Sequence, residues 1–421
     1  MTALQASSVR RRLTQAECDI LIGAHERFLG GRQGGKRALM RFADFTGLNL
    51  SGRNLSDADF TGSSFDGAAL IGTVFERAAL FGCSFRTANL SRAKLTRADI
   101  RGACLRGANL SGANLTQADF REGQIAIPHP RRGLDVLRHE RRTGELDDVN
   151  FAGATLDGTQ LAGVSAYAAD FTDCSMKGVK LAGANLKEAN LSGAILDGVD
   201  IAGANLQGVR LVGAVLIGVD MQSMRQAGAL TAGCLSPAAP CEGLAAEALS
   251  ARAQAHQTWR RTGGAQGAPA RLDGEDLRSL GAQLKNAPLT ALSAKGACLV
   301  GMDLSGAELQ GANFEGADLR MANLSGADLR GARLGGANLT KADLSAACLG
   351  PLPLPGGRST ATQLASSQLR YARLRDADLS QAVMDEADLR GADLTRAKLG
   401  GAGLRGADLT SAVGLELSAA A

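Results

Sequence analysis

The chain has 421 residues and nearly balanced charge, with 46 basic and 42 acidic side chains, so its net charge of +4 does not point to nucleic acid or a membrane surface as the partner. It contains no apolar run as long as a transmembrane helix, and Arg10, Arg11 and Arg12 are not followed by the apolar stretch of a secretory signal. These features argue against membrane insertion and secretion, and we expect the protein in a reducing cytoplasm.

The first predicted element is a helix that begins after Thr14 and extends to about Leu29. Thr14 and Glu17, three residues apart, have the pattern of a capping box. The glycine-rich segment GGRQGG ends the helix. Its apolar residues, which we expect on one buried side, are Ile20, Leu21, Ala24 and Phe28.

A five-residue period follows. Large apolar residues occupy every fifth position from Phe45 to Phe120, and a small residue, mostly Ala, stands two positions before most of them. Asn or Asp often lies between the two, which gives the unit Ala-(Asn/Asp)-Leu-(Ser/Thr/Arg)-Gly. A period of five matches neither a helix nor a strand, and so short a unit can bury its apolar residues only by stacking into a solenoid.

A non-repetitive insertion at 123–146 separates the first run from a second run, Phe151 to Met221, whose phase is shifted by one residue. We expect a short helix at Leu134–Glu140. In the second run Ala166 replaces a large residue, and Tyr167 is expected to cover the gap. The insertion is rich in arginine, at Arg131, Arg132, Arg138, Arg141 and Arg142.

The second half of the chain repeats the plan of the first. His25 and Phe28 precede two glycines, and His256 and Trp259 do the same at the end of a second helical stretch. Two further runs of the five-residue period share one phase across a loop. The chain therefore reads as a tandem duplication with these expected boundaries: 1–40 helix and amino-terminal segment, 41–222 first stack, 223–243 linker, 244–285 second helical cap region, 286–414 second stack with a loop at 350–361, and 415–421 tail.

Units such as ANLSG at Ala108–Gly112 and ADLRG at Ala327–Gly331 resemble the pentapeptide-repeat family, over roughly two thirds of the chain. The resemblance implies an all-β solenoid, a right-handed quadrilateral parallel β-helix with four pentapeptides per coil. We expect two such stacks, each preceded by a short capping helix. The predicted core residues are Phe45, Phe60, Phe65, Phe75, Phe85, Leu110, Phe120, Phe151, Phe171, Leu191, Leu304, Phe314, Leu324, Leu379 and Leu394.

Few residues outside the repeat pattern are candidates for catalysis or for binding a metal or cofactor. The eight Cys form no CxxC pair, and His129 and His139 have no ligand set around them, so we expect neither metal nor cofactor. Asp and Asn exchange at one repeat position, which a general acid or base would not tolerate. We therefore predict no catalytic residue. The predicted structural residues of the caps are Thr14, Glu17, His25, Phe28, His256 and Trp259.

The function expected from these features is a non-enzymatic protein-binding or scaffold protein of bacterial type, which presents rigid faces and the arginine-rich insertion to a protein partner. Two alternatives follow from the family: a DNA mimic that protects a type II topoisomerase (gyrase), and a secreted effector. The acidic second run favours the mimic, but the basic insertion does not. Some family members form homodimers through an end of the stack, and this chain leaves that option open.

Overall fold

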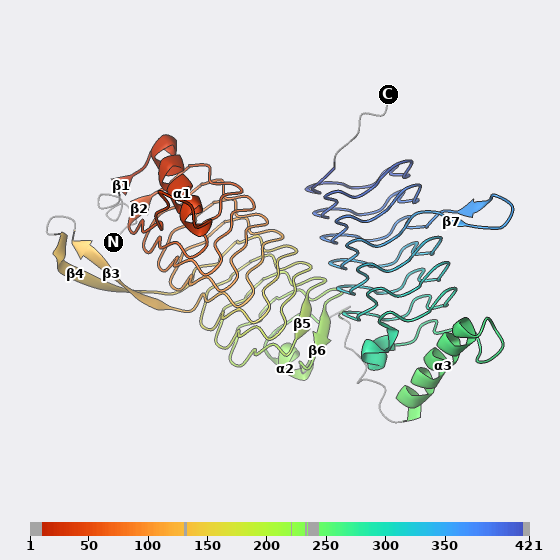
Figure 1. Cartoon of the computed structure of the whole chain (residues 1–421). Coiled ribbons are helices and arrows are strands. Elements are labelled where there is room, and N and C mark those ends of the chain that lie inside the picture. Colours follow the sequence, from red (N-terminus) through yellow and green to blue (C-terminus); the bar gives the residue numbers. More distant parts are fainter. Residues whose placement is uncertain (1–10, 130–132, 220, 232–233, 235–243, 416–421) are drawn as a thin grey trace. The chain divides into compact units, whose positions relative to one another are not determined.

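The structure, a computed structural model, describes residues 11–129, 133–219, 221–231, 234 and 244–415. The chain divides into two compact units, Met1–Pro237 and Ala238–Ala421. Each unit has its own hydrophobic core. In Figure 1 each unit consists of flat, stacked coils accompanied by short helices.

The first unit is a solenoid whose coils contain twenty residues. Leu39 pairs with Asp59, and Asp59 pairs with Ala79, in parallel and twenty positions apart, and this spacing recurs along the unit except across the insertion. Four such pairings occur per coil, one in each pentapeptide, so every coil has four sides. Backbone hydrogen bonds join neighbouring coils, as from Phe65 N–H to the Ser84 carbonyl at 2.7 Å. This ladder satisfies the polar backbone that a narrow apolar interior would otherwise leave unpaired.

The large residue of each pentapeptide points into the solenoid. Phe45, Phe65 and Phe85 stack in one column, with ring centroids 4.7 and 5.0 Å apart. Two residues before Ala166, the position that usually holds a small residue is occupied by Val164, whose side chain is buried. Tyr167, by contrast, is exposed. The expectation that Tyr167 covers this gap is therefore wrong. The predicted core side chains that lie buried in the first unit are Phe45, Phe60, Phe65, Phe75, Phe85, Leu110, Phe120, Phe151, Phe171 and Leu191.

Helix α1, Gln15–Leu29, begins at the predicted capping box, in which the Thr14 side chain accepts from Glu17 N–H and Glu17 accepts from Thr14 N–H. Strand β1, Arg11–Arg12, precedes it and pairs in parallel with β2, Ala43–Asp44.

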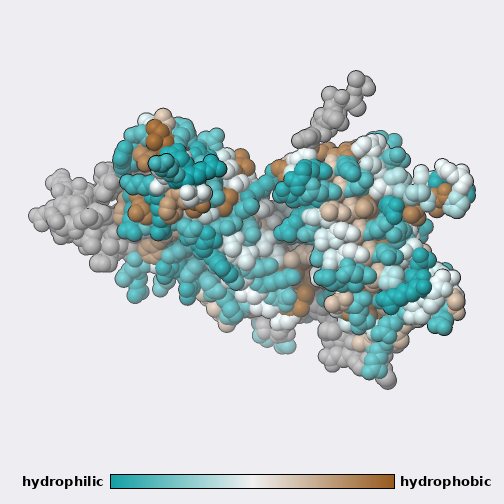
Figure 2. All heavy atoms as spheres, viewed as in Figure 1, coloured by the Kyte–Doolittle hydropathy of each residue, from teal (hydrophilic) through white to brown (hydrophobic). Residues whose placement is uncertain are grey.

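Three of the four apolar residues expected on the buried side of α1 are instead exposed, Ile20 by 71%, Leu21 by 39% and Phe28 by 44%, and Ala24 is half-buried. Cys18, Ile22 and His25 are buried against the first coils. The correction has a physical reason. His25 accepts from Ala38 N–H and lies 2.9 Å from the Ser56 carbonyl, which fixes the side of the helix that faces the stack. Brown spheres over α1 in Figure 2 mark the exposed apolar side.

The insertion is a β-hairpin, not a helix. Strand β3, Gly123–His129, pairs antiparallel with β4, Gly133–Arg142, so the helix expected at Leu134–Glu140 is wrong. Strand pairing with the Ile-Ala-Ile segment of β3 outweighs the helical pattern read from β4 alone. Cys104 pairs with Glu145, 41 positions later instead of twenty. The additional 21 residues are one residue more than four pentapeptides, which explains why the second run is shifted in phase by one residue.

The first stack continues beyond its predicted end. Strands β5, Ile195–Asp197, and β6, Val215–Ile217, pair in parallel and lead to helix α2, Met221–Gln226. Leu230 still pairs with Arg210, and Met224 is buried in the core. Residues 223–230 therefore belong to the first unit and not to the predicted linker.

The second unit begins with helix α3, Leu244–Arg261. Arg271 already pairs with Ser293, 22 positions later, so the first coil begins inside the segment predicted as a helical cap region, 244–285. The 3-10 segment η2, Leu277–Leu284, forms part of this coil and accounts for its irregular length. The boundary prediction missed this coil because η2 breaks the five-residue period.

Further coils of the second unit repeat every twenty residues. The loop predicted at 350–361 contains a short antiparallel pair, β7, Leu352–Pro353, and β8, Ser359–Thr360. Arg333 pairs with Gln363 across 30 positions, so this insertion equals two pentapeptides and preserves the phase. None of the described helices could span a membrane by its length and hydropathy. The predicted core side chains Leu304, Phe314, Leu324, Leu379 and Leu394 are buried.

Candidate functional site

The acidic and amide side chains of the repeat serve the turns. Asp59 accepts from Thr61 N–H at 3.0 Å, and Asn109 accepts from Ser111 N–H at 3.0 Å. This bond to the backbone two residues later is available to either side chain, which explains why Asp and Asn exchange. Among the residues that the structure describes, no group of three His, Cys, Asp or Glu side chains could hold a metal ion.

The cysteines of the stacks behave as small core residues. The Sγ atoms of Cys83 and Cys174 lie 3.1 and 3.0 Å from the carbonyls of Phe60 and Phe151. Cys104 contacts the Glu145 carboxylate at 3.1 Å, and burial raises the pKa of its thiol to about 11. A thiol with so high a pKa is a poor nucleophile at neutral pH. All cysteines described are free thiols, and Cys241 lies outside the described residues.

His25 and His256 hold corresponding positions at the start of the two stacks. The Nδ1 atom of His25 accepts from Ala38 N–H at 3.1 Å, and that of His256 accepts from Ala270 N–H at 3.0 Å. Burial lowers the pKa of both imidazoles, so the neutral form is favoured. Both rings join a helix to the adjacent coil.

The hairpin β3–β4 is the most distinctive feature of the first unit, and it is called the arm below, residues 123–142. It leaves the stack after Phe120 and extends well beyond the coils in Figure 1. Its five arginines outnumber its two acidic residues, Asp135 and Glu140. This excess of positive charge is concentrated in one projecting element.

The base of the arm lies on the two preceding coils. A Cβ atom at Gly123 would lie 2.3 Å from the Phe81 ring, and one at Gly102 would lie 3.1 Å from Arg142 Cβ. Arg142 Nη1 donates to the Gly82 carbonyl at 3.2 Å. The Arg101 guanidinium lies 5.4 Å from the centre of the Phe81 ring. These contacts fix the direction in which the arm leaves the stack.

The predicted partner-binding residues have different positions on the arm. Arg141 is exposed, whereas Arg142 is half-buried at the base. The register pairs Arg141 with Gln124 and Arg138 with Ile127. Arg131 and Arg132 lie outside the described residues.

Sequence reasoning missed Phe81, although a signal for it existed. Nine of the twelve Phe residues stand in the large inward position, and Phe81 does not. An aromatic residue in an outward position of so regular a repeat needs a partner outside the stack. The structure shows that the partner is the base of the arm.

The profile of a family described as pentapeptide repeats matches eight segments of the chain, residues 38–77, 74–112, 105–123, 145–183, 184–222, 289–322, 321–350 and 363–412. The matches cover more than half of the chain, which therefore belongs to the pentapeptide-repeat family. No curated protein sequence matches it.

Solved structures similar to this chain are themselves pentapeptide-repeat proteins. HetL, involved in heterocyst differentiation regulation in the cyanobacterium Nostoc sp. strain PCC 7120, is 20% identical over 92% of this chain and 94% of its own, with a TM-score of 0.18. QnrB1, a plasmid-mediated fluoroquinolone resistance protein, is 20% identical over 45% of this chain and 86% of its own, with a TM-score of 0.27. Rfr23 from the cyanobacterium Cyanothece 51142 is 30% identical over 26% of this chain and 65% of its own, with a TM-score of 0.17. These likenesses are too low to indicate a shared partner.

Proposed function

We propose that this protein is a non-enzymatic scaffold that captures a protein partner through the arm. The observation that carries the proposal is the fixed, basic hairpin rooted on Phe81 and Gly82. A rooted hairpin loses less conformational entropy on binding than a free loop, so its contacts contribute more of their energy to affinity. Its arginines suit a partner with acidic side chains at the interface.

The remainder of the chain supports the arm in this proposal. Helices α1 and α3 act as caps that shield the apolar ends of the two stacks, whose coils are right-handed and quadrilateral as in the family. Thr14, Glu17, His25 and Phe28 belong to the first cap, and His256 and Trp259 to the second. The cytoplasm remains the proposed compartment.

Affinity capture from the native organism tests the proposal. Three proteins are compared: the unaltered chain, a variant in which residues 124–141 are replaced by a short Gly-Ser linker, and a charge variant with Arg131, Arg132, Arg138 and Arg141 changed to Gln. Arg142 is kept because it packs on the stack. We expect both variants to fold and to lose the same partner. Recovery of the same partners by all three proteins would refute the role of the arm.

A matched control is available in the second unit. Its short loop, residues 352–360, is also a hairpin inserted into a stack, but it contains one arginine, Arg358, and no acidic residue. Replacing this loop with Gly-Ser should leave capture of the partner unchanged. Loss of the partner in this control as well would show that capture depends on stack integrity and not on the arm.

The DNA-mimic alternative draws on the second run of the first unit. Residues 147–222 contain nine acidic and four basic residues. Part of that charge is already engaged, since Asp147 pairs with Arg106 at 2.9 Å and accepts from Ser165 at 2.5 Å. A supercoiling assay with purified gyrase and a fluoroquinolone separates the two functions. We expect no protection of gyrase, and protection at stoichiometric concentration would favour the mimic.

A further inference from the structure

A pocket of about 340 Å³ opens in the second unit between the last turn of α3 and the first coils. It is lined by Arg260, Arg261, Asn286, Pro288 and Glu308. This volume is at the lower end of the range of small-molecule sites. Two Arg residues, an Asn and a Glu thus line one open surface pocket, and the only tryptophan of the chain, Trp259, directly precedes Arg260.

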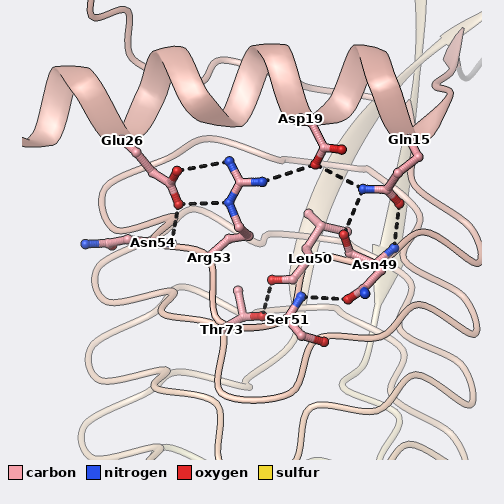
Figure 3. A network of polar contacts seen from close by, with 9 residues as sticks. All are labelled: Gln15, Asp19, Glu26, Asn49, Leu50, Ser51, Arg53, Asn54 and Thr73. Atoms are coloured by element: carbon pink, nitrogen blue, oxygen red, sulfur yellow. Dashed lines mark hydrogen bonds and ion pairs between the residues drawn. The ribbon is translucent and has the colours of Figure 1, made fainter.

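The corresponding corner of the first unit is filled by the protein itself. Arg53 donates to Glu26 at 3.0 and 2.9 Å and to Asp19 at 3.1 Å, and Asn54 N–H also donates to Glu26 (Figure 3). This network joins the coil to helix α1. The side chain that fills the corner comes from the coil, and its acidic partners come from the helix.

The second unit lacks the groups that make this network. Asp59 and Ser293 hold corresponding positions, at the start of the second coil of each stack. Asn54 lies five residues before Asp59, and Pro288 lies five residues before Ser293. Ala287 and Pro288 therefore take the places of Arg53 and Asn54. Ala287 offers no guanidinium, and proline has no N–H to donate. In the second unit Gln283 bonds instead to Ser250 and Gln257 of α3, and the pocket lined by Pro288 remains open at the surface.

The arginines of the pocket have few partners of their own. Arg260 Nε is buried without a hydrogen-bond partner in the described part of the chain. Its guanidinium lies 5.6 Å from the centre of the Trp259 ring. Arg261 makes one long contact, to Gln257 at 3.5 Å. By contrast, Arg252 on the same helix pairs with Glu275 at 2.8 Å.

We propose that the pocket binds a small hydroxy-carboxylate, such as a sugar acid. The planar guanidinium forks of Arg260 and Arg261 match a carboxylate. The Asn286 amide and the Glu308 carboxylate accept hydrogen bonds from ligand hydroxyls. Glu308 also disfavours a ligand with several negative charges, because like charges in one pocket repel. This site is independent of the arm and of the partner proposed for it.

Trp259 reports on the site directly, because its ring contacts Arg260 and no other tryptophan contributes emission. The full chain is titrated with D-gluconate, with hexanoate, which has the same carbon number but no hydroxyls, and with inorganic phosphate, all at constant ionic strength. We expect a saturable emission change with gluconate, with a dissociation constant on the order of 1 mM. Hexanoate should bind at least about tenfold more weakly, and phosphate should not saturate.

The variants separate binding from folding. Arg260→Gln with Arg261→Gln should abolish the gluconate response while circular dichroism remains unchanged, and Glu308→Gln should reduce the preference for gluconate over hexanoate. Arg358→Gln, in a distant loop, is the control and should bind as the unaltered chain does. No saturable response to gluconate, an equal response to hexanoate, or saturation by phosphate alone would each overturn the proposal.

Discussion

Aromatic residues in the large inward position account for much of the stability of the first unit. Phe65 is fully buried between Phe45 and Phe85 in a continuous stack of rings. A solenoid cannot collapse around a missing ring without distorting two coils, so Phe65→Ala should leave a cavity. We expect a loss of about 3–5 kcal/mol in the free energy of unfolding, measured by chemical denaturation. Tyr167→Ala, which removes an exposed aromatic ring, should change the free energy of unfolding by about 0.5 kcal/mol or less. Equal losses in the two variants would contradict the stabilising role of the inward rings.

Histidine gives the first unit a stability that depends on pH. Burial lowers the pKa of His25 from its ordinary value of 6.5, so the unfolded chain binds protons that the folded chain does not. The stability that His25 contributes is therefore fully present above about pH 6.5, and it decreases as the pH falls below that value. Carboxylates affect the stability at lower pH, because hydrogen bonds lower their pKa values. The pKa of Asp303, for example, is lowered to about 2.

We expect thermal unfolding to shift to lower temperature between pH 7.5 and 5, and His25→Gln to reduce this shift. The measurement is a series of thermal melts by circular dichroism at constant ionic strength. A shift of the same size in His25→Gln would assign the pH dependence to other groups. His256→Gln, whose histidine has a pKa lowered for the same reason, tests the second unit in the same way.

Among the elements, the arm depends on Phe81 for its direction. Phe81→Ala removes the ring on which Gly123 lies and the contact with Arg101. Because Phe81 points outward, we expect the stack to lose only about 1 kcal/mol, while amide hydrogens of β3 and β4 exchange at least about tenfold faster. Ile71→Ala is the matched control, an outward apolar residue at the same position of another pentapeptide. Equal exchange in both variants would show that the arm is rooted elsewhere.

The period of five was sufficient to predict the stacks, because each inward residue has one environment that the neighbouring coils reproduce. The helix expected at Leu134–Glu140 was wrong because β4 is defined by its pairing with β3, a contact that the sequence of β4 does not contain. The orientation of α1 was also missed, since polar contacts of His25 and not apolar periodicity select its buried side. Of the candidate site, composition identified the arginines, but the packing of Arg142 against the stack at the base of the arm required the structure.

For the molecule as a whole, the separate cores of the two units predict separate folding. Phe65 and Leu324 belong to different clusters of buried residues, and contacts within each unit define it as compact. Since each solenoid is stabilised by neighbouring coils, loss of one stack should not propagate to the other.

A protease site introduced between Cys234 and Leu244 tests this independence. After cleavage, we expect two fragments whose circular dichroism spectra add up to that of the intact chain and whose unfolding midpoints differ. Phe65→Ala should lower the midpoint of the first fragment and leave that of the second unchanged, because Phe65 belongs to the cluster of buried residues of the first unit alone. Unfolding of either fragment on cleavage would show instead that each stack needs the other, and the tandem duplication would then be one cooperative structure.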